Sequence, residues 1–174
     1  MPSPIGHALG GIAAGWFIQP AGERGASGRQ RGLTLGFAAL GMAADLDLLL
    51  GVHRGPSHSI GATLVIGLVA WAALRHRRFA GRLAAAIAAA YGSHVVLDWL
   101  GADSSPPLGL LALWPVSDAF YQAPWPVFPA ISRRIHQPHL FWVPNIRALA
   151  LELLILVPAV SMVAYSRRVR SRAL

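Results

Sequence analysis

Five apolar stretches alternate with shorter polar connections along this chain, and their lengths are typical of helices in a membrane. The stretches are residues 5–20, 33–52, 59–74, 83–100 and 148–165. Each has 16 to 20 residues, which is close to the roughly 20 that a helix needs to cross a bilayer. Because backbone polar groups in lipid must be satisfied within their own segment, we predict an all-α bundle of about five transmembrane helices. The first stretch is short and Gly-rich, so a helix that enters the membrane only partway is the alternative there.

Composition agrees with a membrane location and indicates one domain. Hydrophobic residues make up 55% of the 174 residues and charged residues only 13%, whereas soluble domains carry about 25% charged residues. Within a single domain at 1–174 we predict a catalytic core at about 1–115, an interfacial connection at 101–147 and a last helix at 148–165. Small residues four apart let helix backbones approach closely, and the first stretch carries two such pairs, Gly6 with Gly10 and Gly11 with Gly15.

The basic residues predict the orientation in the membrane. All 15 are Arg, which together with abundant Ala and Gly suggests a bacterial, GC-rich genome. If the five stretches alternate in direction, eleven Arg lie on one side: Arg24, Arg29, Arg31, Arg75, Arg77, Arg78, Arg82, Arg167, Arg168, Arg170 and Arg172. The other side has Arg54, Arg133, Arg134 and Arg147. The positive-inside rule then predicts a multi-pass protein of the bacterial inner membrane with a cytoplasmic C-terminus. Because these clusters account for the net charge of +8, the expected partner is the bilayer and no nucleic acid.

The long connection at 101–147 is rich in aromatic residues and proline. Its aromatic residues are Trp114, Phe120, Tyr121, Trp125, Phe128, Phe141 and Trp142. Aromatic rings with a polar edge suit the headgroup region of a bilayer. We therefore expect interfacial or re-entrant segments over the outer end of the bundle.

The orientation that follows from Arg alone places a set of acids and imidazoles at the outer end. The set is His7, Asp45, Asp47, His53, His58, His94 and Asp98. An Asp at the centre of a transmembrane helix costs roughly 2.5–3.5 kcal/mol on insertion scales. A divalent cation compensates several such groups together, because it binds neutral His nitrogen and Asp oxygen. With no Cys in the chain, His and Asp are the available ligands.

These residues separate into predicted metal ligands and predicted catalytic groups. His94 and Asp98, at i and i+4, share a helix face and can hold one ion. Asp45 and Asp47 are two apart, so a regular helix cannot aim both at one point. One of them is then a ligand, and the other supports a ligand or acts as a base on a water, unless the helix ends between them. The metal set is His7, Asp45, His58, His94 and Asp98, and the catalytic set is Asp47, His53 and Arg54. Arg54, with its planar fork of donors, suits phosphate.

Each group also has a structural interpretation without metal. His94 and Asp98 can form a hydrogen-bonded pair that joins two helices. Asp45 and Asp47 can pair with Arg54 in an ion cluster. His53 and Arg54 can be interfacial anchors, and His58 can cap the third helix, although Ser57 and Ser59 are better cap candidates.

The order of these motifs resembles the YdjM-type membrane-bound metal-dependent hydrolases. The shared elements are His7, the ADLD stretch at 44–47, HRGPSHS at 53–59, HVVLD at 94–98 and LWP at 113–115. The resemblance spans about residues 1–115. Members of that family typically have Pro where this chain has Ala44 and Thr where it has Ser57. Neither departure removes a ligand.

The motif order is also similar to the zinc-dependent phospholipase C and S1/P1 nuclease group. That similarity implies one zinc on Asp45, His58, His94 and Asp98, with Asp98 bridging to a second ion that His7 also holds. The further His and Glu ligands of that group have no clear match, so we expect one or two ions. The His/Asp set favours zinc, and manganese would accept the same ligands.

Together these patterns predict a metal-dependent hydrolase of phosphoester, phospholipid-like substrates at the extracytoplasmic side. The second hypothesis is a non-enzymatic membrane scaffold or a metal-binding or transport protein. Transport is disfavoured because the cytoplasmic halves of the stretches are almost purely Ala, Leu, Val and Gly, which leaves no polar path. Metal analysis separates a scaffold from an enzyme.

Overall fold

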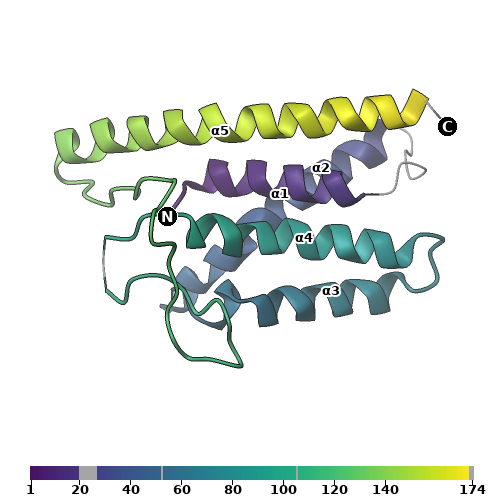
Figure 1. Ribbon diagram of the computed structural model, residues 1–174, viewed down its shortest axis with the longest axis horizontal. Helices are drawn as coiled ribbons and strands as arrows, with labels where there is room; N and C mark the ends of the chain where they lie inside the picture. The colour runs from purple at the N-terminus through teal and green to yellow at the C-terminus, as the bar shows by residue number, and fades with distance from the viewer. Residues whose placement is uncertain (20–26, 52, 105, 173–174) are drawn as a thin grey trace.

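The computed structural model describes residues 1–19, 27–51, 53–104 and 106–172 (Figure 1). This part of the chain is all-helical, and it contains two isolated β-bridges but no strand. The elements are α1 (Pro4–Ile18), α2 (Ser27–Met42), the 3-10 helices η2 (Ala43–Leu50) and η3 (Pro56–His58), α3 (Ile60–Leu74), α4 (Ala80–Trp99) and α5 (Pro138–Arg172). Of the basic residues used to predict orientation, Arg24 lies outside the described residues.

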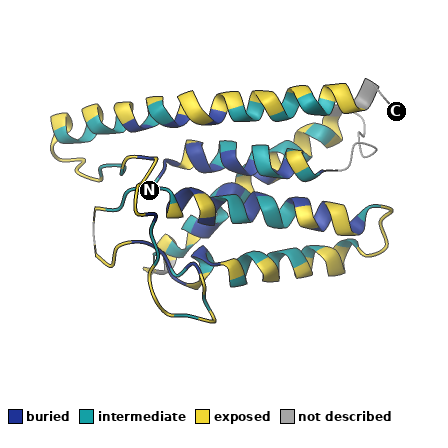
Figure 2. Cartoon of the chain, in the orientation of Figure 1, coloured by how far each residue is buried: buried dark blue, intermediate teal, exposed yellow. Residues whose placement is uncertain are grey.

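Helices α1 and α4 form the centre of the bundle. They pack against each other, α3 packs on α4, α5 packs on α1, and α2 crosses behind both central helices (Figure 1). Figure 2 shows the buried residues concentrated in these two helices, whereas α3 and α5 are largely exposed. The exposed faces of α3 and α5 are apolar, with Leu64, Leu68, Leu154 and Met162 all more than 60% exposed. Such surfaces are typical of helices that contact lipid.

Glycine allows α1 and α2 to cross in direct backbone contact. A Cβ on Gly11 would lie 2.9 Å from the Cα of Gly41, and a Cβ on Gly41 would collide with the carbonyl oxygen of His7. Gly15 accommodates the ring of Phe37 in the same way. The predicted small-residue spacing therefore marks a real helix contact. It brings His7 of α1 and the C-terminal end of α2 to the same place.

Three of the five predicted membrane helices have the length and hydropathy to span a bilayer. They are Gly28–Leu49, Ala80–Trp99 and Pro138–Arg170. The first and third predicted stretches form apolar helices of 15 residues each, α1 and α3. The five-span bundle therefore stays a prediction for these two shorter helices.

The last helix is much longer than the predicted 148–165. Helix α5 has 35 residues and begins at Pro138, so it includes Phe141 and Trp142, which we had assigned to the interfacial connection. At 1.5 Å per residue it is about 52 Å long, well beyond the roughly 30 Å of a hydrocarbon core. Hydropathy detects only the apolar part of a helix. Arg147 directly precedes the apolar run at 148–165, so the hydropathy pattern does not include the first ten residues of α5.

The connection from α4 to α5 folds over one end of the bundle. Backbone hydrogen bonds tie it to itself and to α4, including Leu110 with Tyr121 in both directions and Ala123 N–H to the carbonyl of Trp99. The N–H of Leu111 also donates to the carbonyl of Arg54. The N-terminus, η2 and η3 lie at this same end (Figure 1). The expected placement of its aromatic residues in headgroups stays a prediction.

Candidate metal centre

The site is built around two residues on the buried face of α4. His94 and Asp98 are 0% and 1% exposed, one helical turn apart as their spacing predicts. The Nε2 of His94 lies 3.2 Å from Oδ2 of Asp98. The other ring nitrogen of His94, Nδ1, donates to the carbonyl oxygen of Gly41 at 2.7 Å. The glycine contact between α1 and α2 therefore also sets the orientation of this imidazole.

The two predicted aspartates, Asp45 and Asp47, lie in η2, the 3-10 helix that directly continues α2. With three residues per turn in a 3-10 helix, side chains two positions apart point in different directions. Asp45 accordingly faces both histidines from the cavity side, with Oδ1 3.5 Å from Nε2 of His58 and 3.6 Å from Nε2 of His94. Asp47 lies on the other side of His58, 3.1 Å from its Nδ1. The contacts favour Asp45 as the ligand and Asp47 as the group that orients His58.

Four ligand atoms from three elements surround one point. Besides the contacts of Asp45, the Nε2 of His58 lies 3.5 Å from Oδ2 of Asp98. Four separations between Asp45 Oδ1, His58 Nε2, His94 Nε2 and Asp98 Oδ2 thus fall between 3.2 and 3.6 Å. A tetrahedral zinc ion with ligands at about 2.0 Å separates them by about 3.3 Å. Each of these four separations therefore suits two ligands of one divalent cation.

The hydrogen-bond inventory of these atoms supports the same conclusion. The Nε2 atoms of His58 and His94 and both oxygens of Asp98 are buried, yet none has a hydrogen-bond partner among the described residues. These atoms lie close together without the geometry of hydrogen bonds. Buried polar groups are normally paired, and a buried unpaired carboxylate is costly. A cation between His58, His94 and Oδ2 of Asp98 would satisfy three of these atoms, and a second one beside His7 would satisfy Oδ1.

The other ring nitrogens fix the tautomer that a metal needs. Ser57 Oγ donates to Asp47 at 2.7 Å and lies 3.1 Å from Nδ1 of His58, which donates to it. With Nδ1 protonated in both His58 and His94, each Nε2 carries its lone pair toward the shared point. Such outer hydrogen bonds are the usual support of metal-binding histidines. The donor set fits a divalent cation.

His7 adds a second group of ligands beside the first. Its Nε2 is 3.2 Å from Oδ1 of Asp98, and its ring stacks on His94 at 3.8 Å between centroids. His7, His94 and Asp98 form one group able to hold a metal ion, and Asp45, His53 and His58 form another. The structure thus brings together all five predicted metal ligands, with Asp98 between His7 on one side and His58 on the other.

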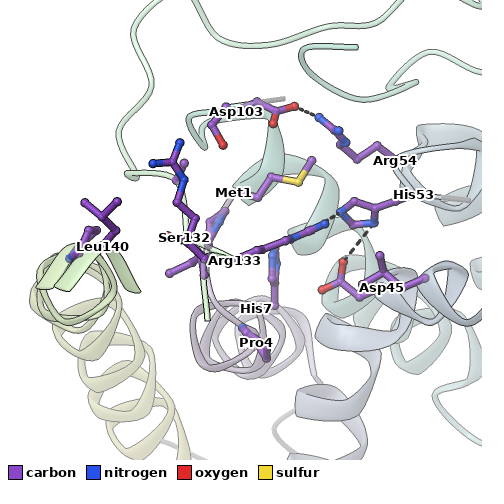
Figure 3. Close-up of a pocket in the computed structure, with 17 residues that line it drawn as sticks. Met1, Pro4, His7, Asp45, His53, Arg54, Asp103, Ser132, Arg133 and Leu140 are labelled. Atoms are coloured by element: carbon purple, nitrogen blue, oxygen red, sulfur yellow. Dashed lines mark hydrogen bonds and ion pairs between the residues drawn. The ribbon is translucent and has the colours of Figure 1, made fainter. Parts of the chain in front are cut away.

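A cavity of about 870 Å³ opens beside these ligands, and Figure 3 shows residues that line it. His7, Asp45 and His53 form its inner wall. The Nδ1 of His53 donates to Oδ1 of Asp47 at 3.2 Å, and its Nε2 accepts from Arg133 at 3.3 Å. Burial lowers the pKa of His53 although Asp47 opposes the shift. His53 therefore lies in a chain of contacts that runs from the cavity to Asp47.

Arg54 is engaged by the α4–α5 connection. Its guanidinium forms an ion pair with Asp103 and donates to the carbonyl of Pro107 at 2.9 Å. The side chain of Asp103 is 8% exposed in this pair and is therefore largely removed from solvent. Arg54 also has a φ of 66°, which is rare for a bulky residue and marks a backbone under strain. Burial and the nearby charge of Arg133 lower the pKa of Arg54.

Several contacts at this end of the bundle lie outside the residues that we singled out from the sequence. Arg133 contacts His53, which is 80 residues earlier in the chain. Asp103 contacts Arg54, which is 49 residues earlier. No local pattern marks either residue. Conversely, His136 and His139 are exposed and lie outside the ligand groups, and Ser59 rather than His58 caps α3, as expected.

The chain was compared with known protein families, curated proteins and solved structures. The family model described as YdjM inner membrane protein matches residues 1–169. No curated protein and no solved structure matches the chain, so the comparisons give no support to a similarity with zinc-dependent phospholipase C or the nucleases. The matched range includes every predicted ligand and, apart from the last residue of Pro138–Arg170, the three described helices that are long enough to span a membrane. This protein therefore belongs to the YdjM inner membrane protein family.

Proposed function

We propose that this protein is a membrane-bound metal-dependent hydrolase that acts on phosphoester, phospholipid-like substrates. The observation that carries the proposal is the convergence of four buried atoms, Nε2 of His58, Nε2 of His94 and the two oxygens of Asp98, beside a point that Asp45 also faces. None of the four has a hydrogen-bond partner among the described residues. A structural ion cluster would pair these atoms with one another. Their arrangement instead suits a cation that is open to the adjoining cavity.

Asp45, His58, His94 and Asp98 would hold the cation, and His7 with Asp98 would hold a second one. When bound, a divalent ion supplies Lewis acidity that lowers the pKa of a water and polarises a phosphoryl oxygen. The His/Asp donor set favours zinc, and manganese accepts the same ligands. Among the residues around the site, Asp47 keeps His58 and His53 in orientation through contacts of 3.1 and 3.2 Å.

The remaining predicted catalytic residues lie on the cavity wall. His53 faces the cavity with Nε2 while Asp47 holds Nδ1, an arrangement that allows a histidine to pass a proton to or from a reactant. Arg54 lines the same wall. Its charge, held in place by Asp103 and Pro107, would stabilise negative charge that develops on a phosphoryl group.

We place the site on the extracytoplasmic side of a bacterial inner membrane, with the C-terminus in the cytoplasm. The metal ligands and the α4–α5 connection lie at one end of the bundle, and the α3–α4 turn and the C-terminus lie at the other (Figure 1). Eleven of the 15 Arg belong to the connections and the C-terminal tail that alternation of the stretches assigns to the side opposite the site. The positive-inside rule supports this orientation. Cysteine labelling of Ser171 and Ser117 from each side of sealed vesicles tests it.

Elemental analysis of detergent-purified protein, followed by a phosphoester hydrolysis assay with the metal found, tests the proposal. His94→Ala and Asp98→Ala should each lose both metal and hydrolysis while still inserting in the membrane. His136→Ala and Asp118→Ala, which change exposed residues outside the ligand groups, are the matched controls. Full activity in either His94 or Asp98 variant would reject the assignment, and stoichiometric metal without hydrolysis of any phosphoester would leave a metal-binding scaffold.

A further inference from the structure

The cavity beside the metal ligands has a cationic rim that the ligand set does not explain. Arg133 and Arg134 come from the segment just before α5, and both line the cavity. Both side chains are exposed, so neither is a packing residue of the bundle. Arg133 reaches His53, and it approaches Arg54 closely enough for its charge to lower the pKa of that guanidinium.

The charges that line the cavity do not cancel. The lining contains three arginines, Arg54, Arg133 and Arg134, and two aspartates, Asp45 and Asp103. Asp103 pairs with Arg54, and Asp45 faces the metal ligands His58 and His94. The two arginines from the connection therefore have no acidic counterpart in the lining. Arginines that converge without an acid are typical of sites for phosphate, which the guanidinium fork binds at two points.

Part of the cavity wall is apolar. Leu140 and Pro144 of α5, Ile131 of the connection and Leu48 of η2 line it. The space thus has room for an anionic group beside the metal ligands and for hydrocarbon against the apolar residues. A volume of about 870 Å³ is in the range of small-molecule sites.

We propose that Arg133, supported by Arg134, binds the phosphoryl dianion of a phosphomonoester and so determines the substrate class of the site. This inference rests on the proposed function for its catalytic meaning, although the binding step can be measured without turnover. In the structure Arg133 donates to Nε2 of His53 at 3.3 Å. A phosphoryl oxygen is a stronger acceptor because charge-assisted hydrogen bonds are about twice as strong as neutral ones. On binding, the guanidinium would turn from His53 to the anion.

Two arginines in place of one select a dianion over a monoanion. A terminal phosphate carries a charge between −1 and −2 near neutral pH, whereas a phosphodiester carries only one. The apolar wall favours a lipid-linked monoester over a soluble one. The site thus differs from one that cleaves the diester bond of an ordinary phospholipid.

Equilibrium dialysis of radiolabelled inorganic phosphate against metal-loaded protein in detergent tests the subsite directly. Arg133→Ala should weaken phosphate binding about 10- to 100-fold, as expected for the loss of a hydrogen bond to a charged group. Arg133→Lys, which keeps the charge but loses the two-point contact, should fall between. Arg147→Ala removes an exposed charge on α5 outside the cavity lining and should bind phosphate like the wild type. Metal content checks that each variant keeps its site.

Displacement of the labelled phosphate identifies the class and source of the ligand. Mixed micelles with phosphatidic acid, a lipid phosphomonoester, should displace it at lower concentration than glycerol phosphate, and phosphatidylglycerol, a diester, should displace it least. Equal displacement by the diester overturns selection of the dianion. Displacement by glycerol phosphate alone overturns the lipid source and leaves a soluble phosphomonoester.

The outcomes separate this inference from the proposed function. If Arg133→Ala loses phosphate binding but the wild type hydrolyses no phosphoester, the subsite stands and the hydrolase assignment fails. If metal-dependent hydrolysis is found and Arg133→Ala retains full phosphate affinity, the assignment stands and the subsite is wrong. Absence of phosphate binding by the metal-loaded wild type likewise overturns the subsite.

Discussion

Two buried carboxylates in this bundle have opposite surroundings. Glu152 of α5 is 0% exposed and Asp98 of α4 is 1% exposed. Glu152 accepts a hydrogen bond from the backbone N–H of Ser3 at 2.8 Å and another from its hydroxyl. Ser3 in turn caps α1, since its Oγ accepts from the N–H of Gly6. Neither oxygen of Asp98 has a hydrogen-bond partner among the described residues.

The difference separates an acid that holds the fold together from one that serves a ligand. Burial is the same in both cases, so burial does not distinguish them. Glu152 is compensated by fixed donors and joins α5 to the start of α1. Asp98 is surrounded by the ring nitrogens of His7, His58 and His94 at 3.2 to 3.5 Å, which offer no well-directed hydrogen bond. Uncompensated buried charge is expensive, and a cation removes the cost.

Removing the charge of Asp98 should have the largest effect of the changes that test the different roles of Asp98 and Glu152. Asp98→Asn keeps the shape of the side chain but loses the carboxylate, and loss of one partner of a buried ionic group costs about 3–5 kcal/mol. We expect metal affinity to fall by about 100-fold or more, measured by metal titration of chelator-treated protein. Glu152→Gln is the matched control and should retain metal. If the two variants lose metal equally, the distinction between the acids is wrong.

Bound metal should raise the free energy of unfolding, and this gain should depend on the carboxylate of Asp98 but not on that of Glu152. At a free zinc concentration 100 times Kd, binding to the folded state adds about 2.7 kcal/mol. The thermal unfolding temperature in detergent should therefore rise when zinc is added to chelator-treated wild type or Glu152→Gln. It should rise far less in Asp98→Asn, because a 100-fold weaker site gains only about 0.4 kcal/mol at the same zinc concentration. A rise of the same size in all three would place the zinc elsewhere.

Asp47 offers a smaller, indirect effect on the same site. Asp47→Asn leaves the ligand atoms in place but weakens the support of His58 and His53. Loss of such an outer contact typically costs 10- to 100-fold in metal affinity, which we expect by competition with a chromophoric chelator. Ser104→Ala, at an exposed polar position of the same cavity, is the control. A loss as large as that of Asp98→Asn would make Asp47 a ligand.

The smallest effect should come from the structural carboxylate. Ser3→Ala removes the α1 cap and one donor to Glu152, and loss of an N-cap side chain costs about 1 kcal/mol. We expect a slightly lower unfolding temperature with normal metal content. Substantial loss of metal in this variant would show that the start of α1 positions His7 more strongly than the contacts indicate.

The sequence alone was sufficient for the helical class and for much of the candidate site. Apolar stretches of membrane length predict helices because hydrocarbon requires every backbone hydrogen bond to be local. The helical repeat puts His94 and Asp98 on one face. Chemical type then restricts the ligands to His and Asp, and the two-residue spacing of Asp45 and Asp47 already indicates that they have different roles.

Other features depended on contacts between distant segments, which no local pattern encodes. The change from α-helix to η2 decides that Asp45, and not Asp47, faces His94. The pairs Arg54–Asp103 and His53–Arg133 join segments 49 and 80 residues apart, and α5 begins at Pro138, outside its apolar run. Hydrophobic pattern and helical period are properties of neighbours along the chain. Which donors a buried Asp98 or Glu152 finds is set by how separate helices pack, and only the tertiary structure decides that.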